Sequence, residues 1–162
     1  MPHPLRRQDR AITDPAAIDA LLRGARFATI ALADGAAPYA VTLSCGYDAA
    51  SHRLCFHVAP VGRKLDIIAR NPRACVTIVA DLGYKAGECA HPFQSLVMEG
   101  RMRLLDDLDE ARSAMRSLIG QLEGAEAVSE LFAHHELDGE AVFRRMSVLV
   151  FEIDDITAKE GE

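Results

Sequence analysis

Three short strand-like segments follow one another between residues 27 and 58, and their spacing limits the possible folds more than any other feature. Residues 27–32, 39–45 and 54–58 are apolar or alternate between apolar and small polar side chains, as half-buried strands do. The connections, residues 33–38 and 46–53, are shorter than the crossover of about a dozen residues that parallel strands need. We therefore expect an antiparallel meander here, and the spacing argues against a doubly wound parallel sheet.

Helices and further strands are expected around this region. Asp14 can accept amide hydrogens of a first helical turn, Pro15 suits the first helical position, and Gly24 can end that helix. Apolar spacing predicts the remaining elements, which are helices over 63–70, 106–123 and 128–135 and strands over 74–80, 93–105 (bending at Gly100) and 147–153. This order predicts an α+β fold, a mostly antiparallel, closed or partly closed barrel with peripheral helices.

Length and charge bound the organisation and the partners. The chain has 162 residues and a formal net charge of −6, so we expect a single domain over 1–162, with an N-terminal arm (1–13) and a short acidic tail (159–162). The acidic excess argues against a nucleic-acid partner. No apolar run is long enough for a membrane span, and the start lacks the apolar centre of a signal peptide. A cytoplasmic protein without a membrane partner is expected.

The cysteines and the histidine pairs predict neither a disulfide nor a metal site. The four cysteines show no CxxC spacing, and in a reducing compartment such residues are usually small buried hydrophobes. Cys89 with His91, and His134 with His135, lack a second ligand pair at zinc-finger spacing. The role of Cys89, His91 and the loop over 83–92 stays open. The motifs GxGxxG, GxxxxGK[ST], HExxH and GxSxG are absent.

One segment has the features of an anion site. Gly62, Arg63 and Lys64 stand at the start of the predicted helix over 63–70. Free amides and the positive end of the helix dipole attract anions there, and the two cations can add direct contacts to a phosphate. His57 lies on the strand just before this segment. A structural role and a functional role are equally compatible with its position.

These segments together resemble the pyridoxamine 5'-phosphate oxidase-like flavoproteins, and within them the nitroimidazole-resistance (Nim) branch. The resemblance extends from about Arg6 to Lys159, and its most specific part runs from Leu54 to Lys64 with Asn71-Pro72 after it. The other matching segments are residues 7–12, 38–47, 93–100 and 151–157.

The resemblance implies an FMN-binding split barrel that forms a homodimer, with FMN at the subunit interface. The backbone of residues 41–43 would lie against the isoalloxazine edge, residues 62–64 would meet the phosphate, and Gln94 with Ser95 would complete the phosphate and ribityl site. The implied cofactor-binding residues are Val41, Thr42, Leu43, His57, Val58, Ala59, Gly62, Arg63, Lys64, Gln94 and Ser95.

The implied function is an oxidoreductase that reduces a small electrophile, such as a nitroaromatic compound, with electrons from a nicotinamide donor. His57 would be the catalytic residue, acting near the reacting centre as a proton donor. Two departures stand out: Gln94 occupies a position where Nim-type sequences often have arginine, and Thr157-Ala158-Lys159 replaces the Arg-x-His ending of the true oxidases. The alternatives are a non-catalytic haem- or flavin-binding module, with His57, His91 or the His134-His135 pair as a haem ligand, and pyridoxamine 5'-phosphate oxidase-type activity.

Overall fold

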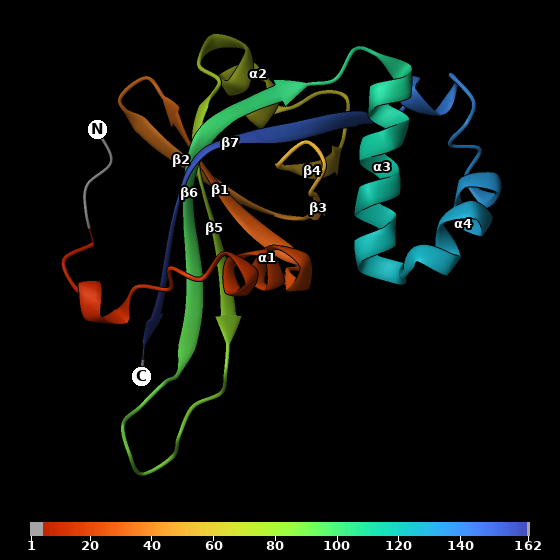
Figure 1. Ribbon diagram of the computed structural model, residues 1–162. Coiled ribbons are helices and arrows are strands. Elements are labelled where there is room, and N and C mark those ends of the chain that lie inside the picture. Colours follow the sequence, from red (N-terminus) through yellow and green to blue (C-terminus); the bar gives the residue numbers. More distant parts are fainter. Residues whose placement is uncertain (1–4, 162) are drawn as a thin grey trace.

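One curled antiparallel sheet forms the body of the protein in the computed structural model, which describes residues 5–161 (Figure 1). Every strand pair is antiparallel, and the order across the sheet is β2-β1-β5-β6-β7-β4-β3. The strands are β1 (Phe27–Asp34), β2 (Ala37–Ser44), β3 (Gly46–Asp48), β4 (Arg53–Val58), β5 (Arg73–Asp81), β6 (Phe93–Leu104) and β7 (Ser147–Gly161). The predicted α+β split-barrel fold is confirmed.

Helices lie at the periphery of this sheet, as expected. They are α1 (Pro15–Gly24), α2 (Arg63–Arg70), α3 (Leu108–Glu123) and α4 (Val128–His134), with short 3-10 turns at Gln8–Arg10, Ala125–Ala127 and Val142–Arg144. Asp14 caps α1 by accepting from the amide of Ala16 at 3.1 Å. Asp107 caps α3 in the same way, accepting from the amide of Glu110 at 2.8 Å. None of the described helices combines the length and apolarity needed to cross a membrane.

The meander predicted over residues 27–58 is wrong. The β1–β2 hairpin and the β3–β4 hairpin lie at opposite edges of the sheet, although Cys45 alone separates β2 from β3 in the sequence. Consecutive Cα atoms are about 3.8 Å apart, so the two edges must come together at this residue, and the sheet must curl. The amide of Cys45 donates to the carbonyl of Arg26 at 3.1 Å and fixes the crossing. Alternation along a strand cannot indicate which distant strand it pairs with.

A β-bulge at Gly100 provides the predicted bend. Glu99 pairs with Asp155 and Gly100 with Ile153, which leaves Asp154 as the extra residue on β7. A Cβ atom on Gly100 would lie 2.0 Å from the carbonyl oxygen of Glu152, so only glycine fits this close approach. The bulge lets two long strands contribute to both halves of the curled sheet.

The last strand does not end at Ile153, where the sequence predicted its end. Residues 159–161, which were predicted to form an acidic tail, belong to this strand. β7 continues to Gly161, and Lys159 pairs with Ser95. Part of the expected N-terminal arm packs on this strand: Ala11 bridges to Lys159. Residues 1–4 of the arm and Glu162 lie outside the described residues. The adjacent charged pairs Asp154-Asp155 and Lys159-Glu160 interrupt the apolar pattern, so the sequence did not indicate the true end of this strand.

Two apolar clusters hold the fold together. The first fills the curl of the sheet and includes Leu22, Phe56 and Met98. The second joins α3 and α4 to the sheet and includes Leu118 and Phe132. All four cysteines are free; Cys45 and Cys55 are buried as expected, whereas Cys75 is half-buried and Cys89 is exposed.

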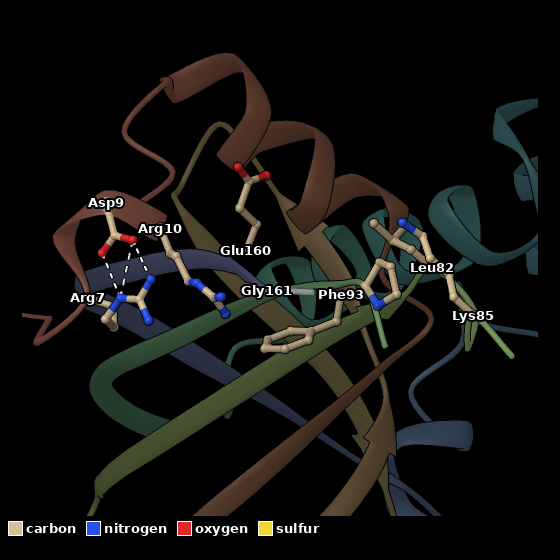
Figure 2. A pocket seen from close by; sticks show the side chains of 9 residues that line it. Arg7, Asp9, Arg10, Leu82, Lys85, Phe93, Glu160 and Gly161 are labelled. Atoms are coloured by element: carbon tan, nitrogen blue, oxygen red, sulfur yellow. Dashed lines mark hydrogen bonds and ion pairs between the residues drawn. The ribbon is translucent and has the colours of Figure 1, made fainter. Parts of the chain in front are cut away.

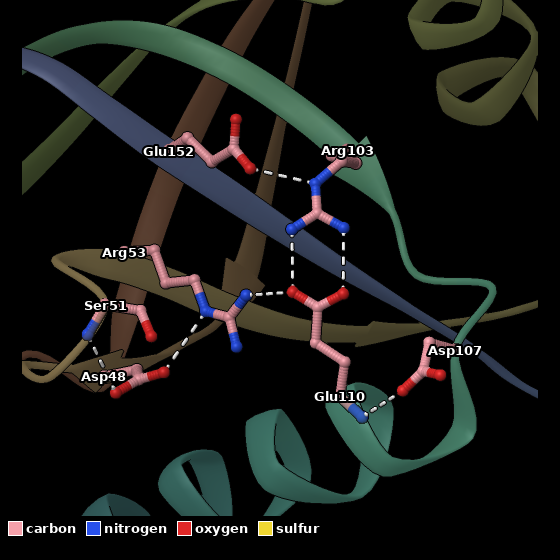
Figure 3. Close-up of polar contacts among 7 residues, drawn as sticks. All are labelled: Asp48, Ser51, Arg53, Arg103, Asp107, Glu110 and Glu152. Atoms are coloured by element: carbon pink, nitrogen blue, oxygen red, sulfur yellow. Dashed lines mark hydrogen bonds and ion pairs between the residues drawn. The ribbon is translucent and has the colours of Figure 1, made fainter.

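An ion-pair network ties the first turn of α3 to the sheet (Figure 3). The side chain of Arg53 is 8% exposed and bonds to Asp48 at 3.2 Å and to Glu110. Arg103 donates two hydrogen bonds to the carboxylate of Glu110, of 2.7 and 3.0 Å, and one of 2.8 Å to Glu152. Arg103 first, and Arg53 second, hold the pKa of Glu110 down at about 2.

We predict that Glu110→Gln lowers the free energy of unfolding by about 2–3 kcal/mol. The substitution leaves a buried arginine with one carboxylate fewer, and breaking buried pairs typically costs about 3–5 kcal/mol; the remaining Asp48 contact reduces the loss. Urea unfolding at pH 7 measures it. The matched control, Glu130→Gln on the exposed surface of α4, should stay within about 0.5 kcal/mol of the unsubstituted protein.

The same ion-pair network determines how the free energy of unfolding changes with pH. The pKa of Glu110 is lower in the folded state, so its contribution is complete above the unfolded value of 4.5 and disappears as the pH falls toward 2. The stability difference between the native protein and Glu110→Gln should therefore shrink between about pH 5 and pH 2. A difference that stays constant over this range would contradict the assignment.

Candidate cofactor site

The start of α2 presents an open helix terminus. Gly62 precedes the helix with a φ of 141°, a backbone conformation that side chains other than glycine's rarely adopt. A Cβ atom there would meet nothing within 4 Å, so the backbone angle rather than crowding requires glycine. No described side chain caps the helix. The first-turn amides of Arg63 and Lys64 are therefore available to an anion.

The Arg63 side chain is held in place beside this terminus. Its guanidinium lies over the ring of Tyr39, 4.8 Å from the centroid, and pairs with Asp34 at 3.3 Å. Arg70 pairs with the same carboxylate at 2.7 Å, and the two arginines, Arg70 foremost, lower the pKa of Asp34. Lys64 is half-buried and has no ion pair among the described residues. The arrangement orients one cation and leaves another for a ligand.

The end of β4 leads to this terminus and carries His57. The His57 side chain is exposed, whereas Phe56 and Val58 on either side are buried in the core. The side chain of Val58 therefore packs inward and does not face the α2 terminus, and Ala59 is the exposed neighbour. Alternation places His57 on the same face of β4 as Arg53 and Cys55, and His57 is the one of these three whose side chain is exposed.

The predicted residues of β2 lie on an edge strand. β2 pairs only with β1 in the described chain, so every second residue has backbone groups without a strand partner on the open side. Val41 and Leu43 pack against the core, and exposed Thr42 shares a 2.9 Å hydrogen bond with Thr29. Free backbone groups at these positions suit the backbone contact that the family resemblance implies.

Gln94 and Ser95 lie at the other end of the sheet from α2 (Figure 1). Arg73, just after α2, pairs with Arg101, whereas Gln94 pairs with Ala80. Seven residues of strand correspond to about 23 Å. The Oγ atom of Ser95 is buried without a hydrogen-bond partner among the described residues. Within one chain, the predicted cofactor residues therefore form two separate groups: residues 62–64 at the start of α2, and Gln94 with Ser95 at the start of β6.

Comparison with known proteins decides the family. A sequence model of the pyridoxamine 5'-phosphate oxidase family matches residues 14–160. The chain belongs to this family. No curated protein matches the sequence.

Solved structures of similar fold include a candidate 5-nitroimidazole antibiotic resistance protein from Bacteroides thetaiotaomicron. It has a TM-score of 0.71 at 22% identity, and the match covers 93% of this chain and 86% of that one. An FAD- and haem-binding protein from Mycobacterium smegmatis has a TM-score of 0.76 at 19% identity, covering 94% and 74%. The flavocytochrome Anf3 from Azotobacter vinelandii has a TM-score of 0.76 at 17% identity, covering 97% and 72%. At these identities the likeness establishes the shared fold.

A second group of cations lies near Gln94, in a cleft that the sequence pattern did not indicate (Figure 2). Arg10 and Lys85 line this cavity of about 610 Å³ together with Phe93 and Glu160, and Arg7 at its rim is paired with Asp9. The cleft brings together the N-terminal segment, the β5–β6 loop and the end of β7. In the same loop His91 bonds to Asp81 at 2.9 Å. Only the pairing of β7 with β6 brings these segments together.

A third feature is an apolar cavity of about 580 Å³ beside His57. Side chains of α3, α4 and the segment that follows α4 form it, including Leu118, Leu131, His135 and Met146. The spacing of these residues predicts helices but not a cavity, because apolar helical residues are usually core. Two of the predicted site residues line it: His57 from the flavin set, and His135 from the alternative set of haem ligands.

Proposed function

We propose that this member of the pyridoxamine 5'-phosphate oxidase family is an FMN-dependent oxidoreductase that reduces a small electrophile. The observation that carries the proposal is the open start of α2, where Gly62, Arg63 and Lys64 present amides and cations next to the exposed His57. Family membership makes a flavin phosphate the fitting anion. FMN is the finer choice among the flavins, because the single helix terminus with Arg63 and Lys64 offers contacts for one phosphate group.

The residues present fit that cofactor. The amides at the α2 terminus and the cations Arg63 and Lys64 would hold the phosphate, as a helix dipole and charge-assisted hydrogen bonds do. The free edge of β2 at residues 41–43 offers backbone donors and acceptors to the ring system. FMN supplies hydride and electron transfer chemistry when it is bound. The protein supplies the position and the charges.

His57 is the group that we assign to proton transfer. Its imidazole is exposed near the end of β4, just before the α2 terminus in the sequence, and it lines the apolar cavity. An imidazole can hold a proton at one ring nitrogen and deliver it to a substrate that has gained electrons. A nitroaromatic compound as substrate and a nicotinamide as electron donor complete the proposal.

The protein would work as a homodimer. Phe27, Val79 and Val97, on neighbouring strands, are 61%, 62% and 41% exposed and lie on a sheet face that no described helix covers. A second copy could cover this face and bring its own Gln94 and Ser95 to the Arg63 and Lys64 of the first. This would unite the two groups that one chain keeps apart.

The purified protein should show the absorbance of bound flavin, or bind FMN when titrated. Lys64→Gln should weaken FMN binding about tenfold or more, because one charge-assisted contact is worth about 1.5–3 kcal/mol. Arg144→Gln removes one positive charge at an exposed position outside the proposed cofactor site and serves as the matched control. A colourless protein that ignores FMN would overturn the proposal, and a Soret band would point to the haem module instead.

We predict that His57→Gln lowers the rate of nitroaromatic reduction about 100-fold, the lower end of what general acids contribute. Glutamine can still donate a hydrogen bond but cannot transfer a proton, so FMN affinity should change less than threefold. Stopped-flow reduction and FMN titration measure the two quantities. A rate within threefold of the native value would remove His57 from the reaction.

Val79→Glu should convert a dimer into monomers and release FMN, because a carboxylate would be buried in the covered sheet face. Ala133→Glu, on the exposed surface of α4, is the control that should leave the dimer intact. Sedimentation with absorbance detection measures assembly and flavin content together. A monomeric native protein with full FMN affinity would contradict the shared site.

A further inference from the structure

Residues of a single chain line the apolar cavity beside His57. It lies between α3, α4 and the segment 137–146 on one side and β4 on the other. Its volume of about 580 Å³ falls in the range of about 300–1,000 Å³ that is usual for small-molecule pockets. The proposed flavin site is different in this respect, because its residues are divided between two ends of the sheet.

The wall of the cavity is aliphatic. Met115, Leu118 and Leu137 are almost fully buried behind it, and Leu122 and Leu131 are half-exposed on its surface. Apolar side chains left partly open at a concave surface favour a ligand that removes them from water. Methionine, at Met115 and Met146, can adapt to ligands of different shape.

The polar groups of the cavity are mostly basic. Arg145, His57 and His135 line it together with a single carboxylate, Glu123. Within the described residues none of these four makes an ion pair or a side-chain hydrogen bond; the nearest aromatic contact of His135 is with His134, at 4.8 Å between ring centroids. The guanidinium of Arg145 and the imidazoles can donate hydrogen bonds. The lining therefore suits a ligand with an acceptor or anionic group.

We propose that this cavity binds the substrate, and that the substrate class is an amphipathic molecule with an aromatic or alkyl body and one anionic or strongly accepting head group. The inference rests on the proposed function, in which His57 faces the reacting molecule. The body lies against the α3–α4 wall, and the head group meets Arg145 and the histidines. A nitro group, a carboxylate or a sulfonate has the required oxygen atoms.

Two fluorescent probes with the same body test the cavity. 8-Anilinonaphthalene-1-sulfonate carries an anionic head, and N-phenyl-1-naphthylamine lacks it. Arg145→Gln should weaken binding of the sulfonate five- to tenfold and change that of the neutral probe less than twofold. Arg144→Gln, the neighbouring exposed arginine that does not line the cavity, is the matched control and should change neither. Equal losses for both probes, or none, would overturn the assignment of the head group.

Variants with a larger side chain in the cavity test whether the probes bind there. Val142→Trp and, separately, Leu131→Trp should each abolish binding of both probes, and unfolding in urea verifies that at least one of them folds. Probe binding that survives in the folded variants would place the probes elsewhere, for example on the exposed sheet face, and would overturn the inference. Hemin binding with a Soret band that the same variants abolish would make the cavity a haem site and would also overturn it.

FMN titration of the same variants separates this inference from the proposed function. Lost probe binding with normal FMN binding supports an independent substrate cavity. Native protein that binds FMN but neither probe overturns the cavity proposal alone. Native protein that binds the probes in the cavity but ignores FMN overturns the proposed function, on which the substrate assignment rests.

Discussion

The crossing at Cys45 is the constraint on which the rest of the structure depends. Two strands at opposite edges of a seven-stranded sheet are joined through one residue, so the sheet can exist only in a curled form. The curl requires long strands that bend, and the Gly100 bulge allows β6 and β7 to do so without a steric clash. The apolar cluster inside the curl then follows from alternation, because the concave side of every strand faces the same interior.

The curl also determines where chemistry can occur. The short connection over residues 59–62 joins the end of β4 to the start of α2, and the register of β5 with β6 puts Gln94 at the other end of the sheet. In the proposed homodimer, each cofactor site would combine one group from each copy of the chain. The exposed apolar side chains of β1, β5 and β6 give a physical reason for the copies to associate, since their burial removes apolar surface from water.

The network around Glu110 links this barrel to the helical side of the molecule. Arg53 on β4 and Arg103 on β6 meet the first turn of α3, and α3 forms one wall of the apolar cavity beside His57. The ion pairs that fix α3 therefore also fix the cavity. His57 stands between two unlike environments, a cationic helix terminus for an anion and an aliphatic pocket for an apolar body.

The sequence by itself determined the local structure and the chemical character of the site. Asp14 and Pro15 start α1 as predicted, Gly100 bends β6, and Gly62-Arg63-Lys64 stands at a helix start, because each depends on neighbours within a few residues. The sequence did not determine how the strands pair: the predicted meander was wrong, and the end of β7 was missed. It also did not indicate the cleft at Arg10 or the cavity at His57. These depend on contacts between segments that are distant in sequence, and only tertiary packing decides which of many compatible pairings forms.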